Sequence, residues 1–491
     1  MKSKFSKVLS ILLSVVLVIS SFYLLYQVIR LNVLPSKFLF PLTIGVVVLD
    51  AIFILLLIYF SKNVVSKIIC IVLTPFICVA SCMGGYYISK TQNVLSSITN
   101  VAKHAKNTVS VVVKESSSIK NKSQLNGVSV GSLRLNEQGS KKALKELSNE
   151  GIVLNQTEYD SMTALLEAFY NGEVDSIIIN ESSRSQILDM EAYSNFDSNT
   201  RVVYQTSYKV KNNDSATSVS DITSKPFNVL ISGSDTRGGF DENGRSDVIM
   251  IATVNPKTHT ILLTSVPRDF YVTTACDAGD GCMQGALDKI THTGIHGTNT
   301  TKRTVEQLLG IEINYTFKVG FDTVTELVDV LGGVDVYVEP GYATTTSQFS
   351  VHEGVNHLNA EQALAFARER YSYTEGDRQR TKNQQQVLMG IVKEATKPSV
   401  ITNYAAIMDT MANTFSTTMS NEEITDLIKY QLNNNPTWKM EQYMVDGTGD
   451  TLMCAELGDA ASVMVPDQST VKMAKDKINA VLAGKSSEDV K

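Results

Sequence analysis

The sequence predicts an α/β protein that three N-terminal helices anchor in a membrane. Two observations carry this prediction: the chain opens with three long apolar runs, and beyond about residue 100 short strands alternate with amphipathic helices. A polar stretch then interrupts the alternation, and a new series of strands starts after Pro226. We therefore expect four parts in the 491-residue chain: a membrane segment (1–88), a small accessory α/β domain (89–210), a linker (211–225) and a larger α/β domain with a central sheet (226–485).

The three apolar runs predict transmembrane helices. They cover residues 8–29, 38–60 and 68–88, and each is long enough to cross a bilayer, for which about 20 residues suffice. A cleaved signal peptide has a shorter apolar core, of roughly 7–15 residues, so we do not expect one here. Five lysines lie at the N-terminus and in the second loop, against Arg30 and Lys37 in the first loop. By the positive-inside rule, this predicts a cytoplasmic N-terminus and an extracellular chain after about residue 90.

Charge is distributed unevenly between these parts. The first 88 residues carry seven Lys and Arg and one acid, a net charge of +6, whereas the other 403 residues carry 37 bases and 49 acids, a net of −12. This division excludes a soluble cytoplasmic enzyme. The acid in the membrane segment is Asp50, and two interpretations are open: a functional intramembrane carboxylate, or a carboxyl group hydrogen-bonded to a neighbouring helix.

The six cysteines do not form a disulfide scaffold of the kind found in small secreted domains. Three lie in or beside the third apolar run, and three, an odd number, lie beyond it. Cys276 and Cys282 are close enough in sequence to bridge a short loop in an oxidising compartment, and we weigh that disulfide equally against free thiols. A zinc site formed by these two cysteines with His292 matches no recognised spacing.

The accessory domain has an α/β pattern but no recognisable chemistry. Strands are expected over residues 109–113, 127–131 and 177–179, and helices over residues 141–149 and 160–170. The domain contains no cluster of His, Cys and Asp and no phosphate-binding loop. We expect it to act as a spacer or as a partner-binding module.

In the larger domain, charged residues adjoin three predicted strands. The first strand, over residues 227–231, runs toward Asp235; the second begins after Asp247; and the third ends at Arg268. If the second and third strands form a hairpin about an Asn-Pro-Lys-Thr turn, its open end places Asp247 beside Arg268. Asp235 and Arg245 then come to the same edge of the sheet.

Two carboxylates and two guanidinium groups at one edge indicate a site for a metal ion together with a phosphate. Mg²⁺ is usually held by one or two carboxylates together with substrate phosphates. Guanidinium groups bind phosphate oxygens in bidentate fashion. The alternative is a set of structural ion pairs, which we would favour if no further arginine joined the group.

A second cluster of polar residues follows about 90 residues later. Asn359 and Gln362 are typical of a capping box at the start of a helix. Arg368 and Arg370 would point to different faces of a continuous helix. If both reach one ligand, the helix must end near Ala367 and the chain must be extended beyond it.

A further helix begins with Asp377 as its expected N-cap. Arg380 and Gln384 lie on one face of it, and the same face is apolar deeper in the helix. Free N–H groups and the helix dipole favour anions at helix N-termini. We favour an anion site over a solvated charged face, since a solvated face would not explain the apolar continuation.

Other catalytic signatures are absent from the sequence. Residues 233–239 lack the GxxxxGK[ST] pattern of nucleoside triphosphatases, and no Ser/His/Asp nucleophile elbow occurs. Lys289 and His292, in a Lys-Ile-Thr-His stretch, are candidates for the rim of the site.

Together these residues resemble the LytR-CpsA-Psr family of cell-wall ligases. The matching stretches occur in family order between Phe227 and about Ile391: NVLISGSDTRGG, RSDVIMIATVNPKT, LLTSVPRDFYV, DKITHTGIHG, LVDVLGGVDVYV, LNAEQALAFARERY and GDRQRTKNQQQVL. Three membrane spans followed by an accessory domain resemble the streptococcal capsule-type branch of the family.

The resemblance implies an α/β fold with a hydrophobic pocket for a polyprenyl chain, and an enzyme that uses Mg²⁺ (or Mn²⁺). Such an enzyme transfers a glycan phosphate, here expected to be capsular polysaccharide or exopolysaccharide, from a polyprenyl-pyrophosphate carrier to peptidoglycan. The resemblance assigns metal binding to Asp235 and Asp247, and catalysis to these two residues with Arg268. Either aspartate would accept the proton of the attacking hydroxyl only if it does not bind the metal. The implied pyrophosphate ligands are Arg245, Arg268, Arg368, Arg370, Arg380 and Gln384, with Arg378 less favoured than Arg380.

The sequence leaves other functions to be weighed. A pyrophosphatase or lipid-phosphate hydrolase needs the same electrostatics, with water as the acceptor. A scaffold needs no intact site, and the full set of acids and arginines argues against it. A transcriptional regulator needs a basic DNA-binding element, for which the expected cytoplasmic parts are too short, so we expect no nucleic-acid partner. The expected partners are the lipid-linked glycan, peptidoglycan, the lipid bilayer and the capsule assembly machinery.

Overall fold

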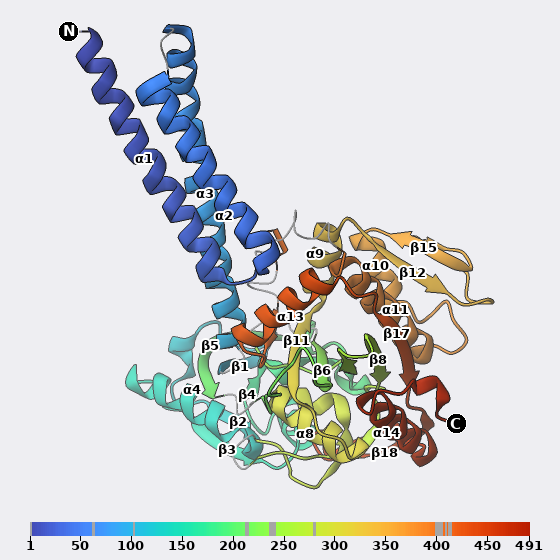
Figure 1. Cartoon of the computed structure of the whole chain (residues 1–491). Helices are drawn as coiled ribbons and strands as arrows, with labels where there is room; N and C mark the ends of the chain where they lie inside the picture. The colour runs from blue at the N-terminus through green and yellow to red at the C-terminus, as the bar shows by residue number, and fades with distance from the viewer. Residues whose placement is uncertain are drawn as a thin grey trace. The chain divides into compact units, whose positions relative to one another are not determined.

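Figure 1 shows the fold in a computed structural model of the whole chain. The structure describes residues 2–60, 64–101, 104–211, 216–234, 242–277, 281–397, 406–407, 410 and 415–491. The chain divides into two compact units. One contains Met1–Ser97, Ala395–Ala412 and Ser420–Pro436, and the other contains the remaining residues. The apolar N-terminal helices belong to the first unit, and the α/β sheets belong to the second.

Three N-terminal helices are long and apolar enough to cross a membrane, as predicted. They are α1 (Lys2–Leu31), α2 (Ser36–Leu55), which continues into the π-helical turn η1 (Leu56–Phe60), and α3 (Val64–Val101). Ser21 Oγ on α1 donates a hydrogen bond to Asp50 Oδ1 on α2 at 2.9 Å. Of the two interpretations of Asp50, the structure therefore shows the second, a carboxyl group that is hydrogen-bonded to a neighbouring helix.

The same unit contains α13 (Asn421–Asn434). Its N-terminus is closed by a capping box, in which Ser420 Oγ accepts from Glu423 N and the Glu423 carboxylate accepts from Ser420 N. Near its other end, Asn433 O accepts from Lys37 Nζ at 2.7 Å. This bond attaches α13 to the start of α2.

The first sheet of the second unit has five strands in the order β3-β2-β4-β1-β5. The strands are β1 (His104–Lys114), β2 (Ser129–Leu133), β3 (Asn155–Tyr159), β4 (Ser176–Asn180) and β5 (Thr200–Lys211). Those predicted from the sequence correspond to β1, β2 and β4. β3 and β5 were not predicted, because β3 is polar and mostly exposed and β5 mixes polar with apolar residues.

Helices cover both faces of this sheet. They are α4 (Glu137–Asn149), α5 (Met162–Asn171), α6 (Arg184–Asp189) and α7 (Phe196–Asn199). Leu165 and Phe169 of α5 pack on one face, and Leu147 of α4 packs on the other. Gly172 ends α5 with a φ of +81°, the left-handed conformation that glycine adopts without a steric penalty.

The second sheet of this unit has six strands in the order β16-β11-β6-β7-β8-β17. The strands are β6 (Phe227–Ser234), β7 (Val248–Asn255), β8 (Thr260–Ser265), β11 (Tyr315–Gly320), β16 (Phe415–Thr417) and β17 (Lys439–Met444). β6, β7 and β8 form an antiparallel meander, and β11 and β17 extend it through parallel pairing. Helices α8 (Thr298–Leu309) and α14 (Gln468–Leu482) pack on one face against Leu230 and Ile251.

A further layer contains α9 (Phe321–Leu331), β12 (Val334–Val338), β15 (Gly354–Leu358), α10 (Ala360–Arg368) and α11 (Asp377–Ala395), which share one hydrophobic cluster. Gln385 of α11 attaches this layer to the sheet, since its Nε2 donates to Tyr443 O at 2.8 Å. The remaining two-stranded sheets are β9 (Tyr271–Thr273) with β10 (Leu287–Lys289), β13 (Thr344–Thr345) with β14 (Ser350–Val351), and β18 (Gly447–Cys454) with β19 (Asp459–Pro466). The α/β fold class is confirmed.

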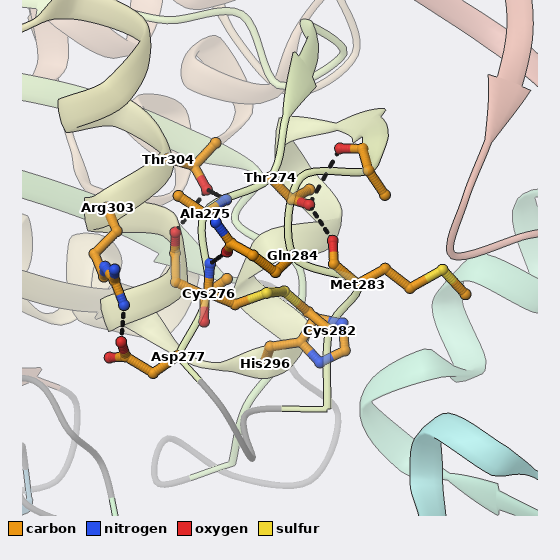
Figure 2. The surroundings of a disulfide bond; sticks show 12 residues. Thr274, Ala275, Cys276, Asp277, Cys282, Met283, Gln284, His296, Arg303 and Thr304 are labelled. Carbon is orange, nitrogen blue, oxygen red and sulfur yellow. Dashed lines mark hydrogen bonds and ion pairs between the residues drawn. A yellow bond between two sulfur atoms is a disulfide. The ribbon is translucent and has the colours of Figure 1, made fainter.

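Cys276 and Cys282 form a disulfide bond (Figure 2). The chain on either side of the bond is held by side chains: Cys276 N donates to Gln284 Oε1 at 2.6 Å, and Thr274 Oγ1 donates to Met283 O at 2.6 Å. His296 lies beside the disulfide in Figure 2. The two thiols are therefore joined, and this decides between the two alternatives that the sequence left open.

The packing of α14 predicts a stability effect. Ile478 is fully buried between α14 and the six-stranded sheet. We expect Ile478→Ala to lower the free energy of unfolding by about 2–5 kcal/mol, because it removes buried apolar surface and leaves a cavity. Asn479→Ala changes the exposed neighbour and should shift this free energy by less than about 0.5 kcal/mol. Thermal or denaturant unfolding of the purified protein measures both, and equal effects would contradict this packing.

Candidate functional site

A cavity of about 380 Å³ gathers most of the predicted site residues. Its lining residues are Asp189, Arg245, Asp247, Arg268, Arg368, Arg370, Tyr371, Arg380 and Gln384. Seven of these nine were singled out in the sequence, and they come from two segments about 100 residues apart. Asp235, the eighth predicted residue, lies outside the residues that the structure describes.

The β7–β8 hairpin brings Asp247 and Arg268 together, as the sequence predicted. Val266 N donates to Ile249 O at 2.9 Å at the open end of the hairpin, and Arg268 Nη1 donates to Asp247 Oδ1 at 2.8 Å. Burial lowers the pKa of the Arg268 guanidinium, but the charges of Asp247 and Asp269 outweigh burial and raise it. Arg268 is therefore a permanent cation at this edge of the sheet.

The 3₁₀ segment η6 (Ile290–His296) is hydrogen-bonded to the backbone at the open end of the hairpin. Its Thr291 O accepts from Ser246 N, and its Thr291 N donates to Arg268 O, both at 3.0 Å. Gly294 is required here, since a Cβ atom would lie 2.5 Å from Gly244 O and 2.6 Å from Ser246 N. This segment thus fixes the backbone on which Arg245, Asp247 and Arg268 are carried.

The end of α10 places Arg368 and Arg370 in the same cavity. Asn359 Oδ1 accepts from Gln362 N and Gln362 Oε1 accepts from Asn359 N, which confirms the predicted capping box. α10 ends at Arg368, and Glu369 is extended with φ −70° and ψ 128°. Because the helix stops between the two arginines, side chains two positions apart reach one site.

The first turns of α11 supply Arg380 and Gln384 to the cavity. α11 begins at Asp377, one residue earlier than an N-cap assignment would give, and Asp377 forms an ion pair with Arg380. Burial lowers the pKa of Arg380; the nearby Arg268 and Arg370 lower it further, while Asp377 opposes them. Arginine stays protonated in proteins, so Arg380 adds a cation that is already repelled by its neighbours.

The cavity has unused hydrogen-bond donors. The Nε atoms of Arg245, Arg268 and Arg380 are buried and have no hydrogen-bond partner among the described residues. An unsatisfied buried donor is costly, and charged donors are the most costly. An anion with several oxygens would satisfy these donors and reduce the repulsion between the cations.

Two lining residues were missed in the sequence. Tyr371 accepts a hydrogen bond from Arg370 Nη2 at 2.6 Å, and the Arg370 guanidinium lies 4.7 Å from its ring centre. The sequence did contain a signal for this contact, because the aromatic Tyr371 directly follows Arg370. Asp189 ends α6 in the accessory domain and forms an ion pair with Arg245. No sequence pattern links it to a segment 56 residues away.

Three lower-ranked candidates lie outside the lining of this cavity. Lys289 Nζ is 3.3 Å from Asp269 Oδ1. His292 is buried, with Nδ1 2.7 Å from Asp288 Oδ1, beside a much smaller cavity of about 10 Å³. Arg378 Nη2 is 2.6 Å from Asp446 Oδ1. Each has a structural partner in this position.

The residues of the cavity are compatible with Mg²⁺. No group of three or more His, Cys, Asp or Glu side chains in the described part of the chain is arranged as a metal site. Mg²⁺ does not require such a group, because it is commonly held by one or two carboxylates with substrate phosphates and water. Asp247 offers a carboxylate whose Oδ1 is occupied by Arg268, and hard oxygen donors of this kind suit Mg²⁺ or Mn²⁺.

Comparison with known proteins finds a family model and several similar proteins. The sequence model described as the LytR_cpsA_psr family matches residues 192–480. A polyisoprenyl-teichoic acid–peptidoglycan teichoic acid transferase, TagU of Bacillus cereus (strain AH820), is 31% identical over 241 residues, 48% of this chain and 76% of that protein. TagU of Bacillus subtilis (strain 168) is 34% identical over 203 residues, 41% of this chain and 63% of that protein. The crystal structure of B. subtilis TagU is 28% identical and covers 52% of this chain and 97% of its own, with a TM-score of 0.40.

The environment of Cys454 near the small cavity predicts an inert thiol. Burial, followed by the charge of Asp288, raises the pKa of Cys454 to about 12. Since the thiolate is the reactive form, we expect iodoacetamide to leave Cys454 unmodified at pH 8 in the folded protein and to modify it in denaturant. Peptide mass mapping measures this. Rapid modification of the folded protein would show that the thiol is exposed or less perturbed.

Proposed function

Because the chain belongs to the LytR-CpsA-Psr family and is a transferase of that family, we propose that it attaches a glycopolymer to peptidoglycan. The donor would be a polyprenyl-pyrophosphate carrier, and the glycopolymer a capsular polysaccharide or exopolysaccharide. The single observation that carries this proposal is the cavity in which five arginines converge from three elements of the fold. A pyrophosphate linkage carries the charge and the oxygen atoms that such a cavity suits.

The arginines have two tasks in the proposed reaction. In the ground state they would bind and orient the pyrophosphate, with Arg245, Arg268 and Arg380 offering Nε donors that have no hydrogen-bond partner in the described residues. A sugar hydroxyl of peptidoglycan then forms a bond to the phosphorus next to the glycan, and the bond to the bridging oxygen breaks, so that polyprenyl phosphate leaves. Charge increases on the departing phosphate, and preorganised guanidinium groups stabilise it.

The second face of the six-stranded sheet supports a lipid-linked donor. Leu230 and Ile251 face α8 and α14, so residues that alternate with them, such as Val229, Ile231 and Met250, face the other way. Val229 and Met250 are apolar and buried there, on the strands whose ends carry the cavity. We propose that it accepts the polyprenyl chain while the pyrophosphate occupies the arginine cavity.

The membrane helices support a reaction at the outer face of the plasma membrane. Three spans with lysines concentrated at the N-terminus and in the second loop favour a cytoplasmic N-terminus. The α/β domains would then be extracellular, where peptidoglycan lies. The polyprenyl carrier is itself a membrane lipid, so an anchored enzyme meets it at the bilayer surface.

Asp247, with Asp235, would hold Mg²⁺ (or Mn²⁺). A divalent ion would supply further neutralisation of the pyrophosphate charge. Asp247 also keeps Arg268 at the edge of the sheet through the 2.8 Å bond from Nη1 to Oδ1. Its substitution would therefore affect both the metal and the arginine.

Substitutions in the native host test the proposed function. We expect Arg268→Ala or Asp247→Ala to reduce the polysaccharide covalently attached to peptidoglycan by more than about tenfold, because transition-state charge stabilisation is lost. The matched control is Arg378→Ala, which removes a nearby arginine that pairs with Asp446 outside the cavity and should leave attachment within about twofold. The measurement is glycan released from purified cell walls, in a strain without a redundant paralogue.

The outcomes separate the alternatives. Unchanged attachment in Arg268→Ala would contradict the ligase proposal. If the purified protein releases polyprenyl phosphate at the same rate with and without a glycan acceptor, water is the acceptor and the enzyme is a hydrolase.

Metal removal gives a second test. We expect EDTA to abolish transfer by the purified protein, and Mg²⁺ or Mn²⁺ to restore it, since the lining carboxylates provide hard oxygen ligands. In Asp247→Asn, restoration should require roughly tenfold or more additional Mg²⁺, because a charged ligand is lost. Full activity in EDTA would contradict a role for the metal while leaving the arginine site in place.

A further inference from the structure

One residue that lines the arginine cavity, Asp189, comes from the part of the chain that forms the five-stranded sheet. Asp189 is the last residue of α6, a helix that precedes β5 of the five-stranded sheet. Its side chain nevertheless lines the cavity and pairs with Arg245 Nη1. The Arg245 side chain is only 14% exposed, whereas that of Asp189 is 60% exposed. The arginine is thus the buried member of this pair, and the aspartate is the solvent-exposed one.

The neighbouring residue holds Asp189 in this place. Met190 is extended, with φ −76° and ψ 118°, and this ends α6. Its side chain packs against Cys454, Leu457 and Val463 of the β18–β19 hairpin. Thr163 attaches the same hairpin to α5, since its N and Oγ1 both donate to Leu457 O, at 3.1 and 3.0 Å. Asp189 is therefore presented to the cavity by a packed junction between the two domains.

The local structure of α6 does not account for a carboxylate at this position. The C-terminal end of a helix carries a partial negative charge and favours basic residues. Among the residues that the structure describes, the Asp189 carboxylate forms its ion pair with Arg245 and none with its own helix. The presence of a carboxylate at position 189 is thus explained by its ion pair with Arg245.

Asp189 and an anionic ligand would compete for the charge of one guanidinium group, that of Arg245. Among the residues that the structure describes, Asp189 is the only side chain paired with Arg245, and it uses Nη1. Arg245 Nε is buried without a hydrogen-bond partner in the same set of residues. A phosphate that engages the guanidinium in the bidentate fashion needs two of its N–H groups, so it must displace the Asp189 carboxylate or share Arg245 with it.

We propose that Asp189 is a specificity-determining residue that the accessory domain contributes to the phosphate cavity. Its carboxylate neutralises Arg245 until an anion of higher charge, such as a pyrophosphate, displaces it. Displacing this carboxylate breaks the same Asp189–Arg245 ion pair for every ligand, and a weakly charged anion gains less from the arginines to offset that cost, so weakly charged competitors are disfavoured. The proposal rests on the proposed function, because it takes the cavity to be the pyrophosphate site.

Binding of inorganic pyrophosphate to the full-length protein in detergent, measured by calorimetry in metal-free buffer at about 0.15 M salt, tests the proposal. We expect Asp189→Asn to bind pyrophosphate about two- to fivefold more tightly than wild type, the range expected from removing an exposed ion pair that competes with the ligand. Asp189→Glu retains the charge and should bind like wild type.

Glu191→Gln is the matched control. It removes the same charge two residues along, from an exposed side chain that does not line the cavity, and salt screens exposed charges. We expect its affinity to stay within about 1.5-fold of wild type. Tighter binding by Asp189→Asn alone supports the proposal.

Other outcomes overturn it in distinguishable ways. Weaker binding by Asp189→Asn would show that the carboxylate only holds Arg245 in place. Equal affinities of Asp189→Asn and Glu191→Gln, with binding lost in Arg268→Ala, would overturn this inference and leave the phosphate site intact. Absence of pyrophosphate binding in wild type, or equal binding in Arg268→Ala, would overturn the proposed function and this inference with it.

Discussion

Repulsion among five guanidinium groups in one cavity is the constraint on which the site depends. Two unit charges about 6 Å apart repel by roughly 3 kcal/mol at an effective dielectric constant of about 20. The fold contains this repulsion by placing carboxylates beside the cations: Asp247 beside Arg268, Asp377 beside Arg380 and Asp189 beside Arg245. The remaining repulsion, and the Nε donors that have no hydrogen-bond partner among the described residues, favour an anion in the cavity.

Several positions in this site depend only on residues that are close in the sequence, and these positions could be predicted. The position of Asp247 beside Arg268 follows from one antiparallel hairpin, since pairing from Asn255 with Thr260 to Met250 with Ser265 fixes which residues meet at the open end. The break after α10 follows from the requirement that Arg368 and Arg370 reach one ligand. In both cases the argument needs only strand pairing or helical periodicity within about 25 residues.

The features that were missed depend on contacts between distant segments. Asp189 reaches Arg245 beside Met190, which is partly buried against a hairpin more than 260 residues later, and such packing cannot be predicted from sequence periodicity. β5 was missed for a related reason: its residues become a strand through pairing along the whole of β1, with a register shift at Val111/Val112. Lys289 and His292 belong to a motif that supports the site from behind, where Thr291 and Gly294 hold the hairpin backbone, so the motif matters through its backbone more than through its charged side chains.

The acidity of the chain beyond residue 88 does not conflict with an anion site. Its net charge of −12 is spread over two domains, and at physiological ionic strength charges more than about 8 Å apart on the surface are largely screened. Burial weakens the screening within the cavity, and its lining contains five arginines and two aspartates, so positive charge prevails there. An acidic surface around a cationic cavity also lowers the tendency of anions to bind elsewhere on the protein. The proposed binding of a phosphate thus depends on the few residues that line the cavity, and not on the net charge of the whole chain.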